Sequence, residues 1–257
     1  MSSTQIPYSF FIGWDVGGWN CDKNKNSRDA IVILNPSLGI VGKPWRGNLR
    51  PFINEAKNAT EFIRKLFSLC AANLPANGEH ITLSIDAPLG FSVEFVELVN
   101  GLKFVESLER SATNPYLYRQ TERCLYCQTK CYPIENRLSP LSSVKDMIGS
   151  QATKGMHVLA KFAPEVERCG VWNDGGLLTA IEAYPAACKD SESIHALRQQ
   201  IANQPTDNQD KMDALTCALI AYIFTNNPEN LISPEDSVPL SEGWIWVPKD
   251  ILQGVET

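Results

Sequence analysis

The sequence predicts an α/β domain built on one mixed β-sheet, and three observations lead to this. Apolar runs at 9–16 and 29–35 flank a polar turn at 22–26, which predicts an antiparallel hairpin. Residues 54–73 carry apolar side chains at a helical period. A further apolar run at 80–86 follows an Asn-Gly break, so we expect a strand that the chain reaches through a helical crossover.

The remaining elements follow from the same patterns. A third short strand is expected near 38–42. Residues 92–168 are predicted to be mainly helix and loop, forming a helical insertion within a single domain that spans 1–257 and covering the edge where strands end. Its helices are expected at about 116–129 and 143–163, and the C-terminal elements are a strand at 177–183, helices at 192–202 and 210–225, and a strand at 243–248.

Composition limits the class of protein. The chain has 257 residues, of which 44% are hydrophobic and 20% charged, as in an ordinary globular domain with a sizeable core. The net charge of −6 argues against a protein that coats nucleic acid non-specifically. The start of the chain lacks a basic segment followed by an apolar one, and no apolar run reaches the length of a membrane span. We therefore expect a cytoplasmic protein with reduced cysteines and no membrane partner.

Acidic residues lie where apolar runs end. Asp15, Asp86 and Glu182 each close such a run, and Asp210 and Asp213 open an apolar helix three residues apart, on one helix face. In open α/β sheets, binding sites lie at the carboxyl ends of strands. Carboxylate oxygens are the ligands of hard cations such as Mg²⁺. Each acid taken alone also fits a turn or the N-terminal turn of a helix, but all of them together favour a metal site.

Six short motifs occur in one order between about residues 10 and 248. They are Asp15-Val16-Gly17-Gly18-Trp19, Ile85-Asp86-Ala87-Pro88-Leu89-Gly90, Arg119-Gln120-Thr121-Glu122-Arg123, Glu182-Ala183-Tyr184-Pro185-Ala186, Asp210 to Leu219, and Glu242-Gly243-Trp244-Ile245-Trp246-Val247-Pro248. The ordered set resembles the family labelled domain of unknown function 429, which is described as predicted nucleases with a ribonuclease H-like fold. The expected order of strand, strand, strand, helix and strand also begins ribonuclease H-like domains.

The resemblance implies that Asp15, Asp86, Glu182 and Asp213 are site residues, with Asp210 beside them. The segment Asn208-Gln209-Asp210 departs from the family pattern, which carries more acids there. Two Mg²⁺ or Mn²⁺ ions would activate water and stabilise the leaving oxygen of a phosphodiester. Asp15 would bridge both ions, Asp86 and Asp213 would each hold one, and Glu182 or Asp210 would ligate or orient water. Arg119, Arg123 and Lys154 are expected to contact the phosphates of a nucleic acid substrate.

Two other functions remain open. Sugar kinases and actin-like ATPases begin with a similar Asp-x-Gly-Gly turn that cradles phosphate, and Asn173-Asp174-Gly175-Gly176 is a candidate for the second such turn that they need. Such a kinase needs two sheet domains, and the chain is a little short for both. A non-catalytic binding module that keeps the same fold is the third interpretation. Oligomeric state is not evident from the sequence.

Cys124, Cys127 and Cys131 form a separate cluster. Thiolates at this spacing suit a structural Zn²⁺ site or an iron–sulfur cluster. A closed zinc site needs four ligands, and only three are local. The same spacing places all three cysteines on one helix face, so a buried face is the favoured interpretation.

Overall fold

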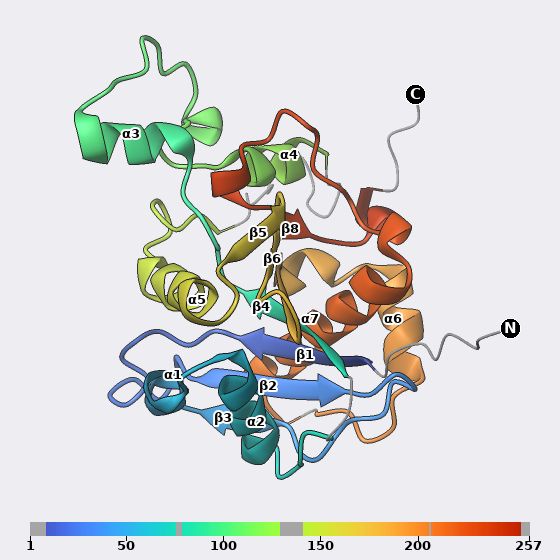
Figure 1. Ribbon diagram of the computed structural model, residues 1–257. Helices are drawn as coiled ribbons and strands as arrows, with labels where there is room; N and C mark the ends of the chain where they lie inside the picture. Colours follow the sequence, from blue (N-terminus) through green and yellow to red (C-terminus); the bar gives the residue numbers. More distant parts are fainter. Residues whose placement is uncertain (1–8, 76–78, 129–140, 206, 253–257) are drawn as a thin grey trace, which may run out of the picture.

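Eight strands in the described part of the chain form one mixed sheet, and helices cover both of its faces (Figure 1). The computed structural model describes residues 9–75, 79–128, 141–205 and 207–252. The strands lie in the order β3-β2-β1-β4-β7-β6-β5, and β8 pairs with β7 outside this path. Their bounds are Ser9–Asp15 (β1), Asp29–Leu34 (β2), Trp45–Gly47 (β3), His80–Asp86 (β4), Glu165–Arg168 (β5), Val171–Asn173 (β6), Leu178–Ala183 (β7) and Ile245–Trp246 (β8). The prediction of an α/β domain with a mixed sheet is confirmed.

The pairing of the central strands sets the direction of every site residue. β1 is antiparallel to β2 and parallel to β4, and β4 is parallel to β7. β3 is antiparallel to β2, as expected for the third strand, but the predicted position near 38–42 is wrong. There the Asn35 side chain accepts hydrogen bonds from the backbone N–H groups of Ser37 and Gly39, and Leu38 has a φ of 60°. After this tight turn a single antiparallel bridge joins Ile40 to Leu34, and the third strand begins only at Trp45.

Helices lie on both sides of the sheet. Their bounds are Arg50–Glu55 (α1), Ala59–Leu69 (α2), Val93–Gly101 (α3), Gln120–Gln128 (α4), Gly149–Phe162 (α5), Glu192–Gln199 (α6) and Gln209–Asn226 (α7). The helix expected at 54–73 is present as the shorter α2, which begins after Asn58 because Asn58 caps it by accepting a hydrogen bond from the Glu61 N–H, and α1 is a separate helix before it. α1, α2 and α5 cover one face of the sheet, and α6 and α7 cover the other (Figure 1).

Helix α7 packs directly against β1. A Cβ atom on Gly13 would lie 1.8 Å from the Ala214 carbonyl oxygen and 2.4 Å from the Ala218 nitrogen, so only glycine permits this approach. Asn208 caps the helix by accepting a hydrogen bond from the Lys211 N–H at 3.3 Å. The contact fixes the first turn of α7 beside the carboxyl ends of β1 and β4.

The predicted helical insertion is only partly helical. α3, α4 and α5 fall within 92–168, and α3 projects away from the sheet (Figure 1). β5 also falls within this range and forms the end of the main sheet, so the insertion contributes a strand that the sequence pattern did not indicate. Its four residues are all exposed and three are charged, so they lack the apolar run by which the other strands were recognised. Among the described residues, no helix has the length and hydropathy needed to cross a bilayer.

Candidate functional site

Asp15 and Asp86 lie side by side at the ends of two neighbouring parallel strands. They are direct partners in the register of β1 and β4, and such strands lie about 4.8 Å apart. Phe10, Ile12 and Trp14 face the side of α2 and α5, so the alternation of the strand directs Asp15 to the α7 side. Asp86 shares that face because residues in register point the same way.

Helix α7 brings two further carboxylates to this face. Asp210 and Asp213 lie in its first turns, and both are partly exposed. Asp210 forms an ion pair with Arg46 of β3, with 2.5 Å between Nε and Oδ2. Asp213 accepts a hydrogen bond from Gln209 at 2.9 Å. Asp15, Asp86, Asp210 and Asp213 are called the acidic cluster below.

The acidic cluster has a strong mutual repulsion. Burial, followed by the charges of Asp86, Asp210 and Asp213, raises the pKa of Asp15 to about 9. Burial, followed by the charges of Asp213 and Glu182, raises the pKa of Asp86 to about 8. Burial also raises the pKa of Asp213. The protein therefore holds these carboxyl groups where a negative charge is costly unless a cation joins them.

Neither Asp15 nor Asp86 is satisfied by the protein. Within the described residues, neither carboxyl group has a hydrogen bond or an ion pair. Oxygen-only donors of this kind suit Mg²⁺ or Mn²⁺, so the chemistry of the cluster fits such an ion. In the same described part of the chain, no three His, Cys, Asp or Glu side chains are already close enough together to hold one metal ion. The acids share a face and repel one another, but a complete ligand set is not preassembled.

Glu182 points to the opposite face of the sheet, although it lines the same pocket as Asp15 and Asp86. Its partner in the register is Ile85, not Asp86. Because side chains alternate along a strand, this offset of one residue turns Glu182 toward the Ile85 side of the sheet. There its carboxylate accepts two hydrogen bonds from Arg119, at 2.6 and 2.8 Å, and one from the Leu89 N–H at 2.9 Å. Glu182 therefore has its own cation inside the protein.

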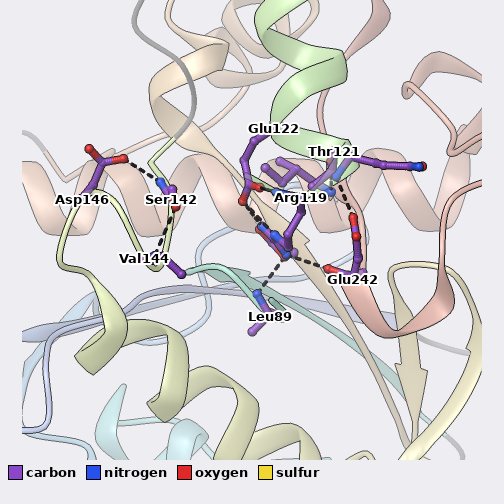
Figure 2. A network of polar contacts seen from close by, with 12 residues as sticks. Leu89, Arg119, Thr121, Glu122, Ser142, Val144, Asp146 and Glu242 are labelled. Atoms are coloured by element: carbon purple, nitrogen blue, oxygen red, sulfur yellow. Dashed lines mark hydrogen bonds and ion pairs between the residues drawn. The ribbon is translucent and has the colours of Figure 1, made fainter. Parts of the chain in front are cut away.

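Arg119 is the centre of a buried polar network and does not face solvent, contrary to its expected contact with phosphate. Its guanidinium also contacts Glu122, at 2.6 Å, and donates to the Glu242 carbonyl oxygen at 2.9 Å (Figure 2). The Glu242 carboxylate accepts from the backbone N–H groups of Gln120 and Val93. Arg119, Glu122, Glu182 and Glu242 are called the Arg119 network below. The network ties α4 and the C-terminal segment to the end of β7.

Lys154 is also buried and is unable to contact a phosphate from its place in the structure. Its Nζ lies 2.6 and 2.8 Å from the two carboxylate oxygens of Asp29, and both side chains are fully buried. Asp29 further accepts hydrogen bonds from the Gly17 and Leu49 N–H groups and from the Trp14 indole. The pair therefore holds the turn that follows Asp15. Sequence reasoning missed Asp29, because it begins a strand and its partner is 125 residues away.

The other candidate side chains lie on or beyond α4. Arg123 is partly exposed on α4. Cys124 is half-buried against the core on the α7 side. The side chain of Cys127 and all of Cys131 lie outside the described residues, so the buried helix face that the sequence favours over a structural metal stays a prediction.

A small pocket lies at the carboxyl ends of β1, β4 and β7. Its volume is about 150 Å³. Asp15, Asp86 and Glu182 lie on its sheet side, and Ile148 and Gln151 come from the region of 92–168. It is lined in full by Asp15, Val16, Asp86, Ala87, Pro88, Leu141, Ile148, Gln151, Glu182, Ala183, Tyr184 and Ile245. The segment expected to cover the strand ends thus contributes walls to the pocket.

The second Gly-Gly turn that a kinase would need closes a hairpin instead. Asp174 accepts hydrogen bonds from the N–H groups of Gly176 and Leu178, and Gly175 has a φ of +74°. The turn links β6 to β7 within the same sheet as Asp15. It therefore does not belong to a second sheet domain in the described part of the chain.

Comparisons with family models, with curated proteins and with solved structures gave no match to this chain. The likeness to the family of predicted nucleases therefore stays a prediction.

Proposed function

We propose that this protein is a divalent-metal-dependent nuclease or a related phosphodiesterase that acts on nucleic acid. One observation carries the proposal. Asp15 and Asp86 stand in register at the carboxyl ends of two parallel strands, unpaired within the described residues, with Asp213 of α7 on the same face. The four carboxylates lie at one end of the sheet, and among the described residues only Asp210 forms an ion pair, with Arg46. The other three favour a site that a cation from solution would complete.

The arrangement of the strands supports a ribonuclease H-like domain. The order β3-β2-β1-β4-β7, in which β1 is antiparallel to β2 and parallel to β4, is the one expected for that fold. Acids on the first strand, the fourth strand and the last long helix are the corresponding positions for a metal site. A fold alone does not define an activity, so the metal-dependent function rests on the acidic cluster.

Asp15, Asp86 and Asp213 would hold the metal, and the chemistry of Mg²⁺ or Mn²⁺ there would be activation of water and stabilisation of a leaving oxygen. Asp210 is already paired with Arg46, so its role is to hold α7 against β3 and to add negative charge nearby. Glu182 acts through Arg119 by fixing the wall of the pocket. It is thus a positioning residue and not a ligand.

The size of the pocket limits what enters it. A volume of about 150 Å³ is well below that of pockets for whole small molecules, which start at about 300 Å³. It suits hydrated ions and one phosphate group, with the rest of a polynucleotide lying outside. Leu141, Ile148 and Ile245 give the pocket apolar walls.

The test measures Mn²⁺ binding by calorimetry and Mg²⁺-dependent cleavage of labelled DNA and RNA. Asp86→Asn removes one proposed ligand, and we expect at least about a 100-fold loss of metal affinity, since even residues outside the ligand shell cost 10–100-fold. Cleavage should fall with it. Asp236→Asn, which changes an exposed acid far from the cluster, is the matched control. Equal Mn²⁺ binding by wild type and Asp86→Asn would contradict the proposal.

A further inference from the structure

A second pocket lies between α6 and α7, next to the acidic cluster. Its volume is about 210 Å³. α6 and the segment before it supply one wall, and the first two turns of α7 supply the other. It is lined by Pro185, Cys188, Lys189, Ile194, His195, Arg198, Gln209, Met212, Asp213 and Thr216. We call it the α6–α7 pocket.

Arg198 presents an unpaired positive charge to this pocket. Its Nη2 donates to the Met212 carbonyl oxygen at 3.1 Å and to the Thr216 hydroxyl, which are both neutral acceptors. Its Nε is buried without a hydrogen-bond partner. Among the described residues it forms no ion pair. Buried N–H donors of a guanidinium group normally have a hydrogen-bond acceptor. The Nε of Arg198 lacks one, and a bound group could supply it.

Lys189 adds a second cation at the rim. It is exposed, and in the described part of the chain its ammonium group has no ion pair. The His195 ring lies beside it, with Nε2 2.7 Å from the Lys189 carbonyl oxygen. Arg198 and Lys189 thus line the α6–α7 pocket together with Asp213, the single carboxylate of its lining.

Asp213 connects the two sites. It belongs to the acidic cluster and also lines the α6–α7 pocket. The charges of Arg198 and Lys189 both act to lower the pKa of Asp213, so the cations lie within electrostatic range of that carboxylate. A group bound in the α6–α7 pocket would therefore lie close to a group held by the acidic cluster.

We propose that the α6–α7 pocket binds a phosphate of the substrate that neighbours the phosphate at the acidic cluster. This rests on the proposed function and narrows its substrate class to oligonucleotides, which carry several phosphates, over esters with only one. Arg198 would donate to phosphate oxygens from the guanidinium nitrogens other than Nη2, which already has two acceptors in the protein, and Lys189 would add a charge.

The test is binding of a fluorescent single-stranded 12-mer, as DNA and as RNA, followed by anisotropy over a range of salt concentrations with Ca²⁺ present. Arg198→Gln should weaken binding about 10-fold or more, as expected for a hydrogen bond to a charged group. The slope of log affinity against log salt should also fall by about 0.7, the value for one phosphate contact on a single strand. Lys189→Gln should lower the slope in the same way with a smaller loss of affinity. Arg64→Gln, which removes an exposed cation on α2, is the control and should change neither.

Each result of these measurements either supports or overturns the phosphate site in the α6–α7 pocket. Binding by Arg198→Gln and Lys189→Gln that equals wild type would overturn the pocket, even where wild type still cleaves and the proposed function stands. Lack of oligonucleotide binding by wild type would overturn it too. Loss of binding in both variants, together with unchanged Mn²⁺ affinity in Asp86→Asn, would support the pocket and reject the metal-dependent function. If thermal melting shows that Arg198→Gln is unfolded, the exposed Lys189→Gln decides alone.

Discussion

The acidic cluster and the Arg119 network are both groups of carboxylates near the strand ends, and they differ in what satisfies them. In the network, Glu122 and Glu182 flank one buried guanidinium, while Glu242 accepts two backbone N–H groups. In the cluster, Asp15 and Asp86 have no such partner among the described residues. Carboxylates that the protein satisfies itself contribute to its stability, whereas unsatisfied carboxylates with raised pKa values are the candidates for a binding site.

The largest expected effect belongs to the buried pair of Lys154 and Asp29. Lys154→Met should lower the free energy of unfolding by about 3–5 kcal/mol, because it leaves the buried Asp29 carboxylate without its cation. Urea denaturation measures this change. Lys65→Met is the control, since its ion pair with Glu55 is exposed and should cost less than about 1 kcal/mol. Equal losses in the two variants would show that Lys154 is not a structural residue.

A second prediction concerns the Arg119 network. Glu182→Gln should lower the free energy of unfolding by about 1.5–3 kcal/mol, the range for hydrogen bonds to charged groups. The loss should be smaller than that for Lys154→Met, because Arg119 keeps Glu122 as a partner. Glu165→Gln, at an exposed site on β5, is the control. If Glu182→Gln instead removes Mn²⁺ binding at unchanged stability, Glu182 belongs with the acidic cluster after all.

Removal of a charge from the acidic cluster should stabilise the metal-free protein, whereas the two substitutions above should destabilise it. Without divalent metal, Asp86→Asn should raise the melting temperature at pH 8 by at least about 2 °C, or roughly 1 kcal/mol for a domain of this size, because it removes a repelled charge. Mg²⁺ should raise the melting temperature of wild type but not of Asp86→Asn. A lower melting temperature for Asp86→Asn in metal-free buffer would mean that the cluster is not under electrostatic strain.

The same cluster predicts how stability depends on pH. The pKa of Asp15 is raised from 3.8 to about 9 in the folded protein, so the folded state binds more protons than the unfolded state between these values. The stability of the metal-free protein should therefore fall as pH rises through that window. Melting curves between pH 5 and pH 9, with and without Mg²⁺, measure it. Stability that rises with pH in metal-free buffer, and equally in Asp15→Asn, would contradict this.

The smallest effect is expected at the ion pair between Arg46 and Asp210. Both side chains are about one-fifth exposed, so Arg46→Gln should cost about 1 kcal/mol or less. Mn²⁺ affinity should change little, since Asp210 is assigned to holding α7 and not to ligation. A large loss of Mn²⁺ affinity would give Asp210 a direct role in the metal site.

The sequence alone predicts the position of most of the acidic residues of the site. The apolar runs located β1, β4 and β7 with the acid at or near each end, and the Asp-x-x-Asp pair located the start of α7. These features are local, since a strand ends and a helix begins where short-range patterns change. The sequence pattern did not predict the position of β3. The Asn35 side chain accepts a hydrogen bond from the Gly39 N–H in a tight turn, and β3 begins only at Trp45.

The tertiary structure alone decided which acids belong together. Central strands are buried on both faces and appear as continuous apolar runs, so their alternation does not reveal which face a final acid occupies. The register between the strands reveals the face of each acid. Asp86 pairs with Asp15, whereas Glu182 pairs with Ile85 and therefore points to the opposite face of the sheet. The cations that satisfy Glu182 and Asp29 come from residues 63 and 125 positions away. The sequence by itself determined where the carboxylates end their strands, and only long-range packing determined which of them are left without a partner.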